Sequence, residues 1–200
     1  HATSHNPDEI KRLGIKIGDT VILEKAGDVI PKITSVLSRL RAGGEKNISV
    51  PNKCPICNSA LEYKKISAKA EAGVILFCTN KKCYAKEVEN IIHFASKKAM
   101  DMRGVGDKII RRFVDLGLVA TPADLFTLKK EDIAGLERFA EKSSENIIET
   151  IERAKKPPLA KFIYALGIPN VGEEMSNSLA RAFGTMEKLE KAKKEDLEKV

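Results

Sequence analysis

Four cysteines are the feature that most constrains this chain of 200 residues. They occur as two short pairs, Cys54-Pro-Ile-Cys57 and Cys78-Thr-Asn-Lys-Lys-Cys83. Each pair has the spacing that lets one tight turn direct two thiolates at a single point, and two such turns supply the four soft ligands of a tetrahedral site. The sequence therefore predicts that Cys54, Cys57, Cys78 and Cys83 bind one structural Zn²⁺, with no open position for catalysis.

Paired cysteines can also form disulfide bonds, act as a redox dithiol or bind an iron–sulfur cluster. The first residues carry no apolar signal segment, and no apolar run is long enough to cross a membrane, so we expect a reducing compartment without disulfide bonds. A redox dithiol needs one pair rather than two. An iron–sulfur cluster uses the same ligands and stays open as an alternative. His93 follows Cys83 on a predicted helix, and we interpret it as an ordinary helix-face histidine rather than a ligand.

The charge of the chain is unevenly distributed. The sequence carries 35 Lys and Arg against 28 Asp and Glu, a net charge of +7. Residues 51–100 hold nine basic and four acidic residues, whereas residues 101–150 hold eight and ten. The basic excess therefore lies on and beside the cysteine stretch. It favours a polyanionic partner, although a solvated lysine surface is the simpler alternative.

Residues 1–50 are predicted to form strands. β-Branched and apolar residues at 20–25, and again at 29–36, are separated by turn residues, which is typical of a hairpin. Pro31 cannot donate to a β-ladder, so the second strand should be an edge strand or carry a bulge there. Residues 48–50 are predicted to form a further short strand, and residues 39–47 a mobile polar connection. Because one hairpin is marginally stable alone, we expect it to pack on the next segment or to belong to a larger β-domain.

The rest of the chain divides into a small cysteine-rich part and a helical part. Within residues 51–85, short strands at 61–63 and 74–77 flank a polar turn, which is the outline of a zinc finger. From residue 86 onward, apolar residues recur at helical spacing. Predicted helices cover residues 86–102, 107–117, 159–166 and 173–183, with further starts at Thr121-Pro122, at Ser143-Ser144 and near Lys193. The fold class is accordingly α+β and multidomain.

The helical part contains a repeated pattern of helix, glycine-containing hairpin and helix. Its three copies lie a little over thirty residues apart, which indicates one repeated supersecondary unit. Glycines permit a tight turn and close backbone approach, while the apolar residue between them plugs the hairpin into the helix pair. Free N–H groups at the start of the second helix then form an anion site suited to a DNA phosphate, without sequence specificity. The predicted contacts are Gly104, Val105, Gly106 and Lys108 in the first copy, Gly135, Arg138 and Lys142 in the second, and Gly167, Asn170, Val171 and Gly172 in the third.

A simpler alternative is that these glycines only join antiparallel helices. The second copy departs from the pattern, because Ala140 stands where a second glycine is expected, so its contact with phosphate is the least supported of the three. Residues 193–200 begin a further helix, and we interpret them as the first half of a fourth unit.

Several runs resemble the bacterial NAD-dependent DNA ligases. Ala2-Thr-Ser-His-Asn6 is similar to the family's Ala-Thr-Leu-His-Asn and departs from it at Ser4, while residues 17–21 and 26–31 resemble later strands of its oligonucleotide-binding (OB) fold. The four cysteines resemble its zinc finger. The runs that resemble its helix-hairpin-helix domain are 92–96, 99–101, 135–139 and 165–168. The resemblance implies the end of an OB fold in residues 1–50, a four-cysteine zinc finger in 51–85 and a tandem helix-hairpin-helix array in 86–200, with its fourth hairpin truncated.

The resemblance implies part of an enzyme that seals nicks in duplex DNA during replication and repair. In that family a lysine of a Lys-x-Asp-Gly motif takes AMP from NAD with the help of Mg²⁺, AMP passes to the 5′-phosphate of the nick, and the 3′-hydroxyl displaces it. This sequence contains no Asp-Gly dipeptide, so we expect no catalytic residue and no ligation by the chain alone. The implied partners are nicked double-stranded DNA and the adenylation domain of the same protein, in the bacterial cytoplasm and away from membranes.

Two other classes of protein fit part of the pattern. One is a stand-alone tandem helix-hairpin-helix module of a repair or recombination protein. The other is a DNA glycosylase, because some members of that class place a catalytic lysine after a hairpin, where Lys108 stands. That role needs a partner aspartate, which the sequence does not identify.

Overall fold

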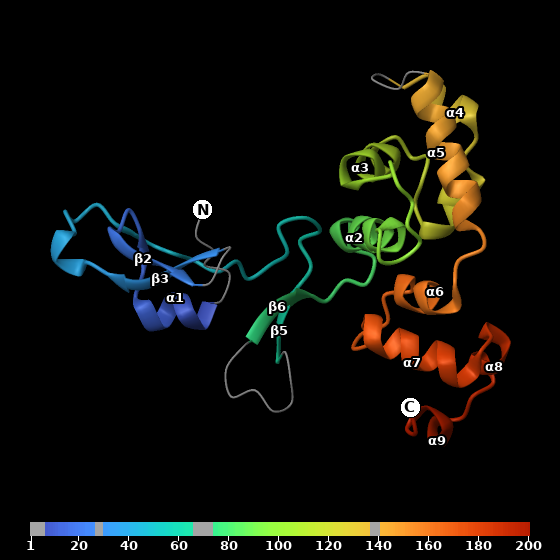
Figure 1. The fold of residues 1–200 in the computed structure, drawn as a ribbon. Helices are drawn as coiled ribbons and strands as arrows, with labels where there is room; N and C mark the ends of the chain where they lie inside the picture. The colour runs from blue at the N-terminus through green and yellow to red at the C-terminus, as the bar shows by residue number, and fades with distance from the viewer. Residues whose placement is uncertain (1–6, 27–29, 66–73, 137–140) are drawn as a thin grey trace. The chain divides into compact units, whose positions relative to one another are not determined.

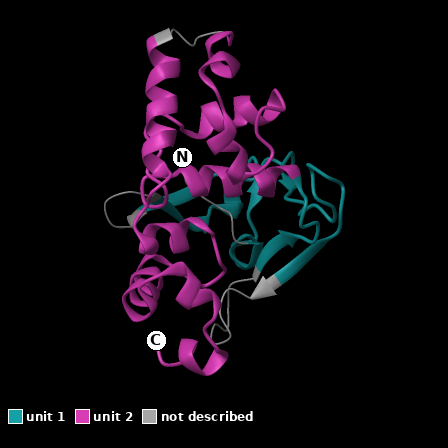
Figure 2. Ribbon diagram, turned by 90° about the vertical axis from the view of Figure 1, so that its right-hand side faces the viewer, with its two compact units in different colours: residues 1–83 teal, residues 84–200 magenta. Residues whose placement is uncertain are grey.

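The chain forms two compact units in the computed structural model, which describes residues 7–26, 30–65, 74–136 and 141–200. The first unit spans His1–Cys83 and the second spans Tyr84–Val200 (Figure 2). Among the described helices, none is long and apolar enough to cross a membrane. The boundary falls directly after the last cysteine. The three-part division, with separate OB and zinc-finger parts, stays a prediction.

The first unit contains the hairpin that the sequence predicts. Its helix and longer strands are α1 (Pro7–Leu13), β2 (Val21–Ala26) and β3 (Ile30–Val36) (Figure 1). Strands β2 and β3 pair antiparallel, with Pro31 opposite Lys25. Among the described residues this sheet has two strands, so Pro31 lies in an edge strand as expected. The register shift lies elsewhere, between Ile22 and Leu23.

Two expectations for this unit are wrong. Residues 48–50 form no strand; the short strand is β4 (Lys46–Asn47), which pairs with β1 (Lys16–Ile17). A short apolar run cannot reveal this, because the partner of β4 is distant in sequence. The connection 39–47 is not simply a mobile polar link, since a 3₁₀ turn, η1 (Ser38–Leu40), leads into Arg41, whose guanidinium donates to the carbonyl of Gly14. Helix α1 was not predicted, although its acidic first turn and basic last turn are a helix signal.

Arg41 and Asp19 hold the first unit together. The Arg41 guanidinium donates to the Asp19 carboxylate at 2.7 and 2.8 Å and to the carbonyl of Gly14 at 2.8 Å. The backbone N–H of Lys16 donates to the same carboxylate at 2.6 Å. The side chain of Asp19 is 1% exposed. The hydrogen bond from Arg41, opposed by desolvation and helped by Lys16, lowers the pKa of Asp19 to about 2.

We expect the first unit to lose stability in acid. An unfolded aspartate has a pKa of about 3.9, above the value of about 2 in the folded chain. The pair therefore contributes fully above about pH 4, and its contribution is lost as the pH falls toward 2. Thermal melts at a series of pH values test this, and Asp19→Asn should flatten the decline. A melting temperature that falls equally in wild type and Asp19→Asn would contradict the assignment.

The second unit is built from helices packed around a mainly aliphatic core. Its elements are α2 (Tyr84–Ala95), α3 (Asp107–Asp115), η2 (Pro122–Thr127), α4 (Lys130–Ala134), α5 (Glu141–Ala154), α6 (Leu159–Ala165), α7 (Glu173–Phe183), α8 (Met186–Glu190) and α9 (Lys194–Leu197) (Figure 1). Side chains from α2, α3, η2, α4 and α5 meet in one buried cluster, which includes Ile91, Ile110, Phe113, Leu125, Ile133 and Ile151. The predicted start at Thr121 is confirmed. There the Asp124 carboxylate accepts the backbone N–H groups of Ala120 and Thr121 at 2.9 and 2.7 Å.

Helix α2 ends seven residues before the predicted Met102, at Ala95. The chain turns back on itself, because the N–H groups of Met100 and Met102 donate to the carbonyls of Phe94 and Ala95 at 3.1 and 3.0 Å. Met100 and Met102 are buried even so. The apolar spacing that predicts a longer helix therefore belongs to a buried turn.

Helix α5 begins at Glu141, so Ser143 and Ser144 lie within its first turn and do not cap it. Ser144 is fully buried, which explains a small residue at that position better than capping does. Helix α8 was not predicted. The helix expected near Lys193 is confirmed as α9.

The N-cap and the first three residues of α4 and of α9 are the same, Lys-Lys-Glu-Asp. In each, the aspartate accepts the backbone N–H of the first lysine, at 2.8 Å from Lys129 to Asp132 and at 3.2 Å from Lys193 to Asp196. The same capped helix start therefore recurs at α9, while the fourth hairpin unit inferred for residues 193–200 stays a prediction.

Candidate metal centre and nucleic-acid interface

The first cysteine pair lies in a tight turn. The N–H of Cys54 donates to the carbonyl of Ser59, and the N–H of Asn58 donates to the carbonyl of Cys54, both at 2.9 Å. Asn58 has a φ of 57°, a left-handed conformation that asparagine adopts more readily than most residues. These bonds close the turn around Cys57.

The second pair is presented by the end of a hairpin and by the turn that follows it. The hairpin strands are β5 (Leu61–Lys65) and β6 (Val74–Cys78). Their register places Leu61 opposite Cys78, and Thr79 donates to the carbonyl of Ala60 through its N–H and its hydroxyl, both at 3.0 Å. Cys83 then lies immediately before α2. The two predicted strands are confirmed, and each is longer than expected.

The four sulfur atoms form one cluster. Each Sγ lies within 4.8 Å of the others, with Cys57 and Cys78 3.4 Å apart and Cys54 and Cys83 3.9 Å apart. Metal–sulfur bonds of about 2.3 Å in a tetrahedron place the sulfurs about 3.8 Å from one another, so the donor set fits a four-coordinate metal. All four cysteines are free of disulfide bonds. The structure thus gathers all four predicted ligands into one group able to hold a metal ion.

The thiols of this cluster differ in acidity. Hydrogen bonds from the Ser59 hydroxyl and backbone lower the pKa of Cys57 to about 6. Burial, followed by the hydrogen bond with Cys57, raises the pKa of Cys78 to about 12. Adjacent thiols therefore share protons rather than all ionising. A cation at their centre would favour the thiolate at each position.

The first hairpin ends in a glycine at the N-cap of α3. Gly104 has a φ of +88°, which favours glycine, whereas Gly106 at the N-cap has an ordinary φ of −87°. Val105 between them is buried, and the carbonyl of Gly106 accepts N–H groups of α3 at 3.0 Å. The turn therefore points the valine inward. It leaves the first N–H groups of α3 without partners inside the helix.

The third hairpin repeats this geometry with one replacement. Asn170, with a φ of +67°, stands where the first hairpin has Gly104, and Gly172 caps α7 with a φ of −82°. Val171 is half-buried. Gly167, with a φ of +62°, follows α6, where an added Cβ would lie 3.5 Å from the ring of His93. That ring contacts α6, since His93 Nε2 lies 2.8 Å from the carbonyl oxygen of Tyr164.

Neither N-cap glycine is required by the free protein. A Cβ atom added at Gly106 or at Gly172 would meet nothing within 4 Å, and the φ of each suits any residue. Open space beside the first N–H groups of a helix is what a closely approaching anion needs. The acidic residue that directly follows each N-cap is paired, Asp107 with Arg111 at 2.6 Å and Glu173 with Lys98 at 2.8 Å.

The second predicted contact set is less complete. Gly135 follows α4 as its C-cap with a φ of −82°, so it lies at a helix end and not at an N-cap. Lys142 is exposed in the first turn of α5, as Lys108 is in α3. Arg138 and Ala140 lie outside the described residues. The matched N-cap geometry is thus present at the first and third copies.

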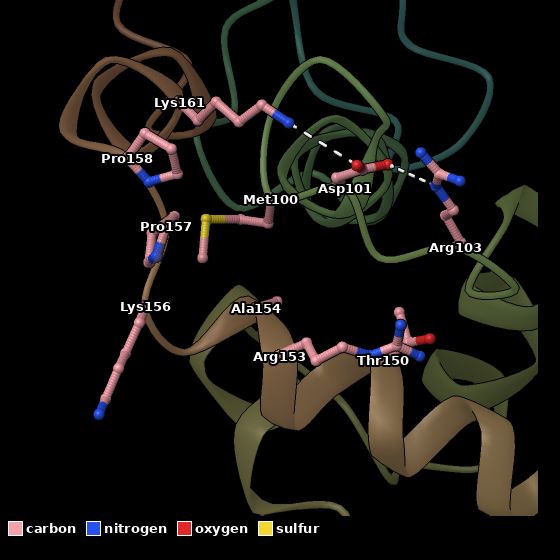
Figure 3. Close-up of a pocket in the computed structure, with 10 residues that line it drawn as sticks. All are labelled: Met100, Asp101, Arg103, Thr150, Arg153, Ala154, Lys156, Pro157, Pro158 and Lys161. Carbon is pink, nitrogen blue, oxygen red and sulfur yellow. Dashed lines mark hydrogen bonds and ion pairs between the residues drawn. The ribbon is translucent and has the colours of Figure 1, made fainter.

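A hollow rich in basic residues was not predicted. Its volume is about 360 Å³, and its charged lining residues are Asp101, Arg103, Arg153, Lys156 and Lys161 (Figure 3). They come from the turn after α2, the end of α5 and the start of α6. No local motif marks a set drawn from three segments. The basic residues on both sides of Pro157-Pro158 are the one signal that could have indicated it.

Comparisons with known proteins agree with this geometry. Residues 1–45 match the family model described as the NAD-dependent DNA ligase OB-fold domain. Over 199 residues the chain is 46% identical to the DNA ligases of Pseudomonas aeruginosa (strain UCBPP-PA14) and Pseudomonas fluorescens (strain Pf0-1). It is 45% identical to that of Stutzerimonas stutzeri (strain A1501). Nearly the whole chain is thus similar to one part of these DNA ligases.

Two further family models match the helical part of the chain. Residues 96–153 match a SAM-like helix-hairpin-helix tandem, and residues 161–200 match a helix-hairpin-helix motif. The first range contains the hairpin at α3 and the second contains the hairpin at α7. The alignments with the three ligases cover 96% of this chain and 25% of each relative, so the chain spans a quarter of their length. The resemblance and the α+β fold class inferred from the sequence are confirmed.

Proposed function

We propose that this chain is the DNA-binding portion of an NAD-dependent ligase and holds nicked duplex DNA through its phosphate backbone. The observation that carries the proposal is the matched pair of N-caps at Gly106 and Gly172. At each N-cap, a glycine that the packing of the free chain does not require lies beside the first N–H groups of a helix. Contacts of this kind go to phosphate oxygens and carry no base identity, so binding should not depend on sequence.

The proposed metal is one Zn²⁺, with Cys54, Cys57, Cys78 and Cys83 as its ligands. Four thiolates close the coordination shell, so the metal supports the fold and has no position for substrate. An iron–sulfur cluster is the alternative occupant of the same four thiolates. Metal analysis and visible absorption of the purified chain separate the two.

The chemical step belongs to other parts of the proposed enzyme. NAD, Mg²⁺ and the AMP-accepting lysine would act in an adenylation domain, because this sequence has no Asp-Gly dipeptide and hence no Lys-x-Asp-Gly motif. Incubation of the chain with NAD should therefore yield no covalent AMP. Because the proposed partner is DNA, we also propose that the protein works in the bacterial cytoplasm.

The stand-alone DNA-binding module is the weaker interpretation. Its best support is the hairpin pair itself, but the three relatives named DNA ligase align with 96% of the chain, including the finger and the first unit. The glycosylase interpretation rests on Lys108 alone. Borohydride trapping on abasic DNA tests it, and we expect no adduct.

Fluorescence anisotropy with labelled duplexes tests the DNA-binding proposal. The chain should bind two nicked duplexes of unrelated sequence with the same affinity, within about twofold, because backbone contacts do not read bases. An unlabelled duplex of either sequence should compete equally well. Affinity for one sequence only, or no binding to any duplex, would contradict the proposal.

A further inference from the structure

The basic hollow in the second unit brings together cations from three segments. Arg103 comes from the turn before the first hairpin, Arg153 from the end of α5 and Lys161 from α6. Lys156 also lines the hollow, but its side chain points away from the others in Figure 3. Cations held this close repel one another unless an anion lies between them.

Asp101 is the one acidic residue among those that line the hollow. Its carboxylate lies 3.3 Å from Arg103 Nε and 3.7 Å from Lys161 Nζ, with Arg153 across the hollow (Figure 3). Charge-assisted hydrogen bonds are shorter, about 2.7–2.9 Å. One carboxylate is therefore shared loosely between two cations, and a third faces it. Arg153 also lies 4.0 Å from the Glu149 carboxylate, so two carboxylates face three cations and a surplus of positive charge remains beside the hollow.

The backbone, rather than the ion pairs, positions Asp101. Its φ is 51°, in the left-handed region that aspartate and asparagine tolerate. Its N–H donates to the carbonyl of Ser96, and its carbonyl accepts the N–H of Arg103, both at 2.9 Å. Asparagine fits the same turn, so the charge can be removed without changing the backbone.

We propose that this hollow is a second phosphate-binding site, which takes a backbone phosphodiester of the duplex held at the first hairpin. In the free protein the Asp101 carboxylate stands in for that phosphate between Arg103 and Lys161. Arg103 directly precedes Gly104, so a strand that reaches the N-terminus of α3 passes the mouth of the hollow. The inference rests on the proposed DNA-binding function and adds to it an anion site outside the hairpin motifs.

Asp101→Asn is the sharpest test. Removing the stand-in carboxylate frees two cations for phosphate, so the affinity for duplex DNA should rise about fivefold, the size of one surface charge pair. Misfolding cannot produce a gain in affinity. Glu152→Gln is the matched control, because it also removes one negative charge, near the end of α5, where Glu152 pairs with Lys155 outside the hollow. Equal gains in the two variants would overturn the proposal.

Lys161→Gln tests the same site by removing one of its positive charges. It should weaken duplex binding about fivefold and reduce the log–log salt slope by about 0.9, the value for one phosphate contact. Lys156→Gln removes the same charge from a side chain that points away, so its slope should stay closer to that of wild type. The reverse order of the two effects would contradict the assignment.

A separate NMR titration distinguishes a DNA phosphodiester from free inorganic phosphate as the group that the hollow binds. Inorganic phosphate, at the same phosphate concentration as a saturating duplex, should leave the Arg103 and Lys161 resonances in place, whereas the duplex should move them. Displacement by inorganic phosphate alone would overturn DNA as the occupant. If wild type binds duplex DNA but Asp101→Asn behaves as Glu152→Gln does, the hollow fails and the hairpin proposal stands. If wild type binds no duplex, the proposed function itself fails.

Discussion

Removal of the bound metal is expected to unfold the zinc finger predicted in residues 51–85 and to leave the second unit folded. Structural zinc contributes about 10–16 kcal/mol to the folding of zinc-finger peptides, which is as large as the whole stability of a typical domain, about 5–15 kcal/mol. The finger has little else to hold it, since β5 and β6 form a two-stranded hairpin whose Tyr63 and Phe77 are 57% and 41% exposed. The second unit has its own buried cluster.

Amide hydrogen exchange before and after chelation measures this difference. Protection should disappear around Cys54 and Cys78 while the amides of α2 to α5 stay protected. Cys57→Ser should give the same pattern and lower the zinc content below one per chain. Asn58→Gly is the control, because glycine accepts the φ of 57° at that position and leaves all four thiolates in place. Unchanged protection of the finger after complete metal removal would contradict the structural role.

Replacement of both N-cap glycines with valine is expected to abolish most duplex binding without destabilising the protein. A Cβ atom at Gly106 or Gly172 meets nothing within 4 Å in the free chain, whereas a valine there would occupy the space beside the helix N–H groups. Hydrogen bonds to a charged group contribute about 1.5–3 kcal/mol. Each single variant should therefore bind duplex DNA about tenfold more weakly, and the double variant about a hundredfold.

The control for this pair is Gly44→Val. That glycine also has open space around it and lies in the first unit, outside the predicted contacts. Anisotropy titrations give the affinities, and thermal melts should show the same melting temperature for all variants within the error. Unchanged binding by the double variant would show that the glycines only join antiparallel helices, which is the simpler alternative for this motif.

Local chemistry explains what could be predicted from the sequence. The cysteine pairs specify their own turns, so Cys54, Cys57, Cys78 and Cys83 are found together as expected. The glycine spacing of the first and third hairpins likewise specifies an N-cap within a few residues, at Gly106 and Gly172. Strands β2, β3 and β6 are marked by β-branched residues between turn signals, and β5 by Leu61 and Tyr63. In each case the structure is decided by neighbours in sequence.

Long-range contacts explain what could not be predicted. The pairing of β4 with β1 and the binding of Arg41 to Asp19 join segments more than twenty residues apart. Helix α2 ends at Ala95 because the following turn is buried by other helices, which no apolar spacing reveals. Arg153 and Lys161 meet Arg103 only after α5 and α6 have packed. Gly135 looked like a hairpin glycine by spacing alone, yet it lies at a helix C-cap.

The salt dependence of nicked-duplex binding tests the central claim most directly. If both hairpins and the basic hollow each neutralise one phosphate or more, the logarithm of the binding constant should fall with the logarithm of the salt concentration. Three contacts give a slope of about −2.7 or steeper, from about −0.9 per phosphate. The slope should be the same for duplexes of different sequence. A slope near zero, with affinity unchanged between low and high salt, would contradict a chain that grips DNA by its phosphate backbone.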